Sequence, residues 1–226
     1  MNTQPGIYGR KLGMTQVFTP DGTVQRVTVI EAGPVSVIGK RTKEKDGYSA
    51  LIVGFEERAA RHTTKPLGGI FKKAAMTPKR VLRELRTSEE FVARYEVGQT
   101  MKLDDIFEAG QLVDARSRTR GRGFSGVMRR WSFAGGVGSH GTHEYFRHGG
   151  SIGTNMTPGR TLPNLKMPGH YGDETVSVLN LRVCRVDAEK HLLLLDGGVP
   201  GAKNALVLIR RAVKARAPSK ATGARG

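Results

Sequence analysis

The sequence predicts a mainly β protein whose body is interrupted by a long, basic, glycine-rich extension. Short β-branched runs separated by turn residues lie toward both ends of the chain. Residues 116–170 between them show no strand alternation and carry many arginines and glycines. Because short strands bounded by turns are typical of all-β folds, we expect one β body and one segment outside its core.

The first strands are predicted as two antiparallel pairs. Residues 14–18 and 24–31 flank a Pro-Asp-Gly turn, and the second strand holds the β-branched run Val27-Thr28-Val29-Ile30. Residues 35–42 and 48–55 form the second pair across a charged connection. Short antiparallel strands in this arrangement predict a barrel.

The middle of the chain gives weaker signals. Residues 63–77 are rich in Gly, Lys and Thr and show little periodicity. Residues 80–86 are predicted as a strand, with a helix as the alternative, because their apolar residues are too few to decide. Residues 87–114 hold seven acids against two bases, which predicts a solvent-exposed face. The acids are Glu89, Glu90, Glu96, Asp104, Asp105, Glu108 and Asp114.

Residues 116–170 are strongly basic, with nine Lys or Arg, the single acid Glu144 and a local charge of +8. Their glycines and three prolines leave too little apolar surface to offset the cost of ordering the backbone in water. A loop of this length inside a domain is expected to be functional or to become ordered on a partner, and we expect the second. A short helix is predicted at 127–133.

The β pattern resumes at 175–186, 191–195 and 205–210, separated by turns. We therefore predict a body of residues 1–115 and 173–210, an extension of residues 116–172, and a basic tail of residues 211–226. The tail is expected to be mobile or to make a second contact with the partner.

The charge identifies the class of partner. Lys and Arg number 37 against 20 Asp and Glu, giving a net charge of +17 and a pI near 10.5. This balance favours a nucleic acid as the partner, with an anionic membrane surface as the rival. The acidic face of residues 87–114 should point away from that nucleic acid. No apolar stretch is long enough for a membrane-spanning helix, and no signal peptide is expected. Cys184 is the only cysteine, which excludes an internal disulfide. We expect a cytoplasmic protein.

Two motifs resemble catalytic signatures but lack the context that those signatures need. Residues 121–126 match G-x-G-x-x-G, yet the segment before them is unsuited to the buried strand of a dinucleotide fold. Residues 149–153 match G-x-S-x-G around Ser151, with Asp173 and His191 in hydrolase order, yet no apolar strand enters and Pro158 soon follows. We expect no enzymatic activity.

Histidines and aromatic residues of the extension fit RNA binding better than metal binding. His140, His143 and His148 have workable ligand spacing, but no further ligand stands nearby to complete a zinc site. Aromatic residues alternate with arginines, a mixture that binds irregular RNA through stacking and charge. We expect Trp131 and Phe133 to pack inward while Arg129 and Arg130 point toward phosphates. No metal, cofactor or small-molecule substrate is expected.

Several long segments resemble the bacterial type of ribosomal large-subunit protein three, over residues 11 to about 210. The most specific is Gly121-Arg122-Gly123-Phe124-Ser125-Gly126-Val127-Met128-Arg129-Arg130-Trp131. The others are residues 11–15 with Phe18, 27–34, 46–48, 139–141, 150–153, 166–172 and 198–201. Together these segments are characteristic of that family.

The resemblance implies a β-barrel body of the translation-protein type and an extension that threads through large-subunit (23S-type) ribosomal RNA. It also implies a role in early subunit assembly, contacts with ribosomal proteins fourteen and nineteen, and a position near the peptidyl transferase centre for Gly153, Thr154, Asn155 and Met156. The candidate rRNA-binding residues are Lys11, Arg116, Arg118, Arg120, Arg122, Arg129, Arg130, Trp131, His140, His143, Arg147, His148, Arg160, Lys166 and His170.

The sequence departs from the family pattern at two places. Met156 replaces a glutamine that some members methylate, so no such methylation is expected, and Asn164-Leu165 replaces the usual Gly-Lys. Two other classes of function stay open from the residues alone: an enzyme using Ser151 or the histidines, and a general DNA- or RNA-binding architectural protein. The latter is permitted by charge, although the chain shows no clear recognition helix or dimer pattern.

Overall fold

A computed structural model describes residues 3–214 of the chain. Its contacts divide the chain into two units: a body that ends at Arg118 and resumes at Thr175, and an extension of Thr119–Glu174. No helix in residues 3–214 combines the length and apolar character needed to cross a membrane. The predicted tail is only partly described: Arg211 ends strand β12, and residues 215–226 lie outside the described range.

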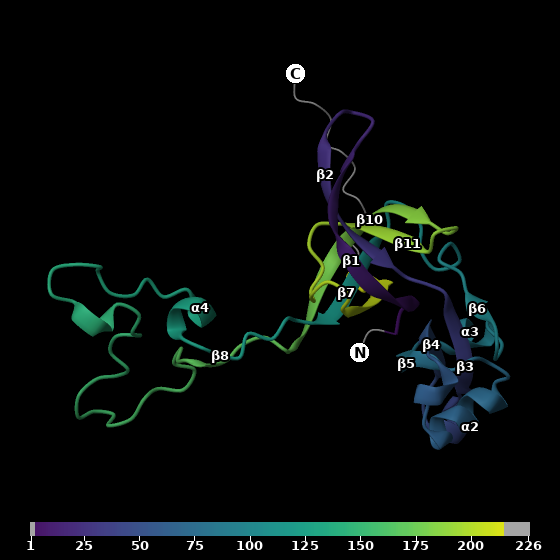
Figure 1. Cartoon of the computed structure of the whole chain (residues 1–226), viewed down its shortest axis with the longest axis horizontal. Helices are drawn as coiled ribbons and strands as arrows, with labels where there is room; N and C mark the ends of the chain where they lie inside the picture. Colours follow the sequence, from purple (N-terminus) through teal and green to yellow (C-terminus); the bar gives the residue numbers. More distant parts are fainter. Residues whose placement is uncertain (1–2, 215–226) are drawn as a thin grey trace. The chain divides into compact units, whose positions relative to one another are not determined.

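The body contains a closed barrel of six strands in the order β1-β12-β7-β10-β11-β2 (Figure 1). The strands are β1 (Gly6–Phe18), β2 (Val24–Glu31), β7 (Leu112–Arg118), β10 (Thr175–Asp187), β11 (Leu192–Asp196) and β12 (Leu206–Arg211). Each neighbouring pair is antiparallel, so the predicted β-barrel body is confirmed. Strand β1 begins at Gly6, well before the predicted start.

A second sheet in the body has the order β5-β4-β3-β6. Its strands are β3 (Val35–Arg41), β4 (Ala50–Glu57), β5 (Lys79–Arg86) and β6 (Thr100–Met101). The predicted pairing of the second two strands is confirmed, and so is the strand at 80–86. However, these strands form a sheet of their own and do not enter the barrel, because β4 pairs with β3 and β5 only.

Short helices complete the body: α1 (Lys43–Asp46), η1 (Ala60–His62), α2 (Lys65–Lys73) and α3 (Glu89–Ala93). Helix α2 falls in a segment whose periodicity looked weak. It packs Leu67, Phe71 and Ala74 against Ile38 and Leu82 of the second sheet. These helix positions are spaced i, i+4 and i+7, which places them on one face.

One hydrophobic core runs through the barrel and the second sheet. Along β12, Val207 and Ile209 are buried between less buried neighbours, the alternation expected of a strand with one face inside. The acidic segment also contributes, since Leu103, Ile106 and Phe107 are fully buried. Six of its seven acids are exposed and Asp114 is half-buried, so the segment covers the core with apolar residues and presents its carboxylates to solvent.

Candidate nucleic-acid interface

The extension starts as a narrow two-stranded ribbon. The Thr119 amide donates to the Glu174 carbonyl at 2.8 Å, and the Arg122 amide donates to the Tyr171 carbonyl at 2.9 Å. Strands β8 (Phe124–Ser125) and β9 (Gly169–His170) continue this pairing. Gly172 has a φ of +73°, and a Cβ there would overlap the Arg120 carbonyl oxygen. Because the two segments of the ribbon lie so close together here, only glycine fits at this position.

The predicted boundaries of the extension differ from those observed. Arg116 and Arg118 were assigned to the extension but lie in β7, where residues pair with both β10 and β12. Their side chains are exposed, while Ala115 and Ser117 are buried, which places the two arginines on the outer face of the barrel. The regular backbone pairing explains why the body reaches Arg118: these residues complete the barrel ladder.

Arg116 borders a surface hollow of about 410 Å³, whose charged lining also includes Arg86, Arg210, Glu84 and Asp114. Burial lowers the pKa of Arg210, and the positive charge of Arg116 lowers it further. The hollow therefore brings three arginines and two carboxylates together on the barrel wall.

Lys11 takes part in the fold itself. Its ammonium group donates to the carbonyls of Val199 at 2.7 Å and Gly201 at 3.2 Å, and burial lowers its pKa. These contacts hold the 199–201 turn against β1. An RNA contact by Lys11 stays a prediction, and the structure already gives its charge two protein acceptors.

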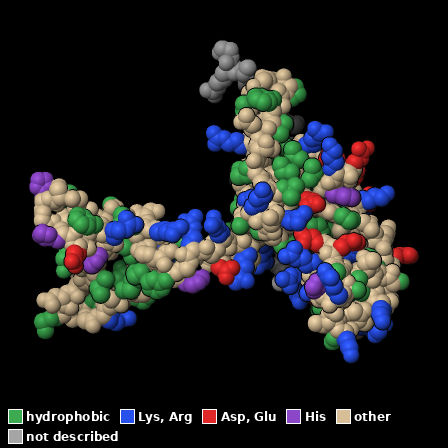
Figure 2. Space-filling model, viewed as in Figure 1, with side chains coloured by type: hydrophobic (Ala, Val, Ile, Leu, Met, Phe, Trp, Pro, Cys, Tyr) green, Lys and Arg blue, Asp and Glu red, His purple; other side chains and the backbone are tan. Residues whose placement is uncertain are grey.

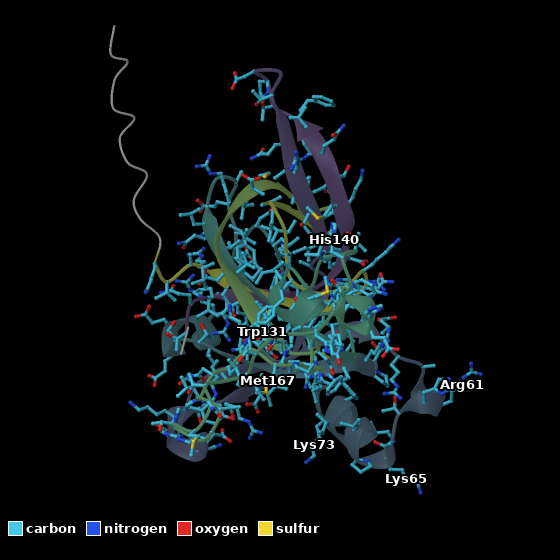
Figure 3. All side chains as sticks on the ribbon, turned by 90° about the vertical axis from the view of Figure 1, so that its left-hand side faces the viewer. Arg61, Lys65, Lys73, Trp131, His140 and Met167 are labelled. Atoms are coloured by element: carbon cyan, nitrogen blue, oxygen red, sulfur yellow. The ribbon has the colours of Figure 1, made fainter. Side chains whose placement is uncertain are left out.

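A cluster around the Met167 carbonyl fixes the inner part of the extension. Helix α4 (Val127–Trp131) supplies the Arg130 guanidinium and the Trp131 indole N–H, each donating to this carbonyl at 2.9 Å. Trp131 and Met167 are labelled in Figure 3. The guanidinium of Arg130 lies 4.9 Å from the Trp131 ring centroid, and the Lys166 ammonium 6.0 Å from it. The two hydrogen bonds to Met167 and the cation–π contact of Lys166 thus join α4 to the returning segment.

The expected inward packing around α4 was wrong for Trp131. Val127 is the buried residue of the helix, Phe133 is half-buried, and Trp131 remains 39% exposed. Trp131 is held by the polar contact of its N–H, which leaves much of the ring at the surface. Helix α4 also ends at Trp131, two residues before the predicted end, because Ser132 adopts a left-handed conformation with φ +61°.

Most basic residues of the extension face solvent (Figure 2). Within residues 3–214, no hydrogen bond or ion pair engages the side chains of Arg120, Arg129, Arg147 and Arg160. Arg122 lies over the Tyr171 ring at 5.2 Å. His170 belongs to β9 and is exposed. The surface so formed presents several guanidinium groups that the protein itself does not neutralise.

The outer part of the extension exposes aromatic and imidazole rings. His140, His143 and His148 are all exposed, and His148 meets the Tyr145 ring edge-on at 4.9 Å. Among residues 3–214 no group of three or more His, Cys, Asp or Glu side chains could hold a metal ion. Phe124, Tyr145 and Phe146 are also exposed. Exposed rings beside unneutralised arginines can stack on bases and contact phosphates.

The Ser151 motif lacks the strand–turn–helix geometry that presents a nucleophilic serine. The Ser151 hydroxyl donates to the Gly153 carbonyl at 2.9 Å, a local turn contact. A single 3-10 turn, η2 (His143–Tyr145), precedes the motif in place of a strand, and no helix follows it within the extension. Gly153, Thr154, Asn155 and Met156 lie in an exposed loop, in which the Thr154 hydroxyl donates to the Thr157 carbonyl at 2.6 Å.

Replacing Trp131 with alanine should loosen the extension more than replacing any one exposed arginine. The change removes the indole hydrogen bond and both cation–π contacts, whereas Arg147→Ala removes one solvated charge. We expect hydrogen exchange at residues 166–170 to rise several-fold for Trp131→Ala, measured with the nucleic-acid partner that the sequence predicts. Arg147→Ala is the control. Equal exchange in both variants would show that the Met167 cluster does not order this segment.

Comparisons with known proteins match this chain to one family. The family described as Ribosomal protein L3 matches residues 59–192, more than half of the chain. "Large ribosomal subunit protein uL3" of Sorangium cellulosum is 68% identical over 216 residues, covering 96% of this chain and 93% of the relative. The same-named proteins of Myxococcus xanthus and Thermotoga maritima are each 49% identical, covering 98% and 95% of this chain and 99% of each relative.

The barrel, its extension and these relatives define a structural constituent of the large ribosomal subunit, a class without enzymatic activity. The chain belongs to the ribosomal protein L3 family.

Proposed function

We propose that the protein binds large-subunit ribosomal RNA directly, and that its extension orders on that RNA. The observation that carries the proposal is the lack of a core in the extension. Of residues 119–174, only Ser125 and Val127 are buried. A segment so poor in buried apolar surface gains little from folding alone, whereas neutralising phosphates would stabilise its ordered form.

The same proposal assigns roles to the two units. The body docks through the basic outer face of β7, and the extension carries its exposed arginines and rings into irregular RNA. By family likeness, residues 153–156 lie near the peptidyl transferase centre, and proteins fourteen and nineteen of the large subunit are the neighbours. An early part in subunit assembly and a place on cytoplasmic ribosomes belong to this proposal as well. Acidic residues of the 87–114 segment face away from the RNA.

Hydrogen exchange of the extension, free and bound to large-subunit RNA, tests this proposal. We expect amides of residues 126–168 to exchange rapidly in the free protein and slowly in the complex, while amides of β7 and β12 are protected in both. Protection of the extension in the free protein would contradict it. Equal protection by duplex DNA would instead favour a general nucleic-acid-binding protein.

Introducing a lysine at Leu165 should add one phosphate contact. Leu165 is 40% exposed and stands where the family usually has a basic residue, beside Lys166. We expect Leu165→Lys to raise the salt slope of RNA binding by about 0.7–0.9, the value for one neutralised phosphate. Leu165→Gln is the uncharged control. An unchanged slope for the lysine variant would show that this position faces no phosphate.

A further inference from the structure

A second basic surface lies on the body, in a segment that is separate from the extension. From Arg58 to Arg83 the chain contains eight Lys or Arg and no acid. Lys79 and Arg80 are paired with Glu57 and Glu56. The remaining charge is concentrated around α2 and the preceding turn η1, where Arg61, Lys65 and Lys73 point away from the ribbon (Figure 3).

Helix α2 carries three lysines on the face opposite its buried one. Lys65, Lys72 and Lys73 are spaced i, i+7 and i+8, so they share a face, and all three are exposed. Leu67, Phe71 and Ala74 occupy the other face and pack on the second sheet. Within residues 3–214 no carboxylate lies within ion-pair distance of these three ammonium groups.

Two glycines occupy the same face, between the lysines. Gly68 and Gly69 stand at i+3 and i+4 from Lys65, inside a helix that glycine disfavours. Neither has a positive φ, and a Cβ at either position would meet no atom within 4 Å. The fold therefore does not require glycine at either position. Their effect is to leave the helix backbone bare over the strip bounded by the lysines.

We propose that this lysine face of α2 (Lys65, Gly68, Gly69, Lys72 and Lys73) is a second RNA-docking surface. A ribose-phosphate backbone lies across the bare strip at Gly68 and Gly69, and the lysines neutralise its phosphates from both ends. A flat strip lets the backbone approach the helix more closely than side chains would allow, and three mobile ammonium groups suit phosphates without reading bases. This inference rests on the proposed RNA-binding function and gives the body a second contact, besides the outer face of β7.

The test compares three full-length variants in footprinting and salt-dependent binding with large-subunit RNA. The first is Lys65→Gln, Lys72→Gln and Lys73→Gln together. The control is Lys43→Gln, Lys45→Gln and Lys102→Gln, exposed lysines that each have an acid within two residues, with the same loss of three charges. The third is Gly69→Leu, which adds bulk to the strip and should also favour the helix.

The α2 triple variant should lower the salt slope by about 2–3 and lose one set of protected nucleotides, distinct from the set that depends on residues 122–168. The control triple should change the slope by less than about 1. Gly69→Leu should bind RNA about tenfold more weakly while its Tm rises by about 2–4 °C. An α2 triple variant with every protection intact overturns this inference while RNA binding by the extension stands. Absence of any protection by the unmodified protein overturns both.

Discussion

Replacing Phe107 with alanine should lower the free energy of unfolding of the body by about 3–5 kcal/mol. Phe107 is 1% exposed and is among the largest fully buried side chains of the core that joins the barrel to the second sheet. Truncation removes a whole ring from this site and leaves a cavity that the surrounding strands can fill only in part.

Phe18→Ala is the matched control, because Phe18 is 66% exposed at the end of β1 and the same atoms are removed. We expect this substitution to change the free energy of unfolding by no more than about 0.5 kcal/mol. Urea unfolding should be followed by far-ultraviolet circular dichroism, since the single tryptophan lies in the extension and reports on that unit alone. Equal losses in the two variants would mean that Phe107 does not anchor the core.

Replacing Arg120, Arg129, Arg147 and Arg160 together with glutamine should lower the salt slope of RNA binding by roughly 3–4. These four guanidinium groups make no hydrogen bond or ion pair within residues 3–214, so their charge is available to phosphates. Affinity at moderate salt should fall by more than about 100-fold if each makes one phosphate contact. The stability of the body should hardly change.

A matched control changes four exposed arginines of the body that lie outside the Arg58–Arg83 segment: Arg26, Arg94, Arg182 and Arg185 to glutamine. We expect this control to change the salt slope by less than about 1. RNA binding measured over a series of salt concentrations gives the salt slope of each variant, and these slopes compare the extension arginines with the control arginines. Equal slope changes would contradict the special role of the extension arginines, because charge alone would then explain binding.

Much of the barrel could be predicted from local sequence signals. The Pro20-Asp21-Gly22 turn between β-branched runs predicted the β1–β2 hairpin, and the β pattern of residues 205–210 after a turn predicted β12. The separate second sheet could not be predicted, because local patterns do not specify which strands pair. Strand β1 started earlier than expected because its glycines obscure the pattern. A Cβ at Gly9 would approach the Glu31 carbonyl oxygen to 2.8 Å, so glycine is needed for close strand packing.

The candidate site was predicted in outline and less well in detail. The charge of residues 116–170 located the extension, but Arg116 and Arg118 proved to belong to the barrel wall. Trp131 was expected in a local core, whereas its N–H binds a carbonyl at the surface. Helix α2 was missed because Gly68 and Gly69 weaken its helical signal. The spacing of its lysines, and the absence of acids from Arg58 to Arg83, could have revealed this basic face.

Chemical footprinting of large-subunit ribosomal RNA tests the central claim most directly. The intact protein is compared with a variant lacking residues 122–168, at moderate salt and with duplex DNA as competitor. Direct binding by a docked body and an RNA-ordered extension predicts two protected regions, of which only the interior one disappears with the deletion. Diffuse protection that duplex DNA abolishes, or an interior region that survives the deletion, would contradict it.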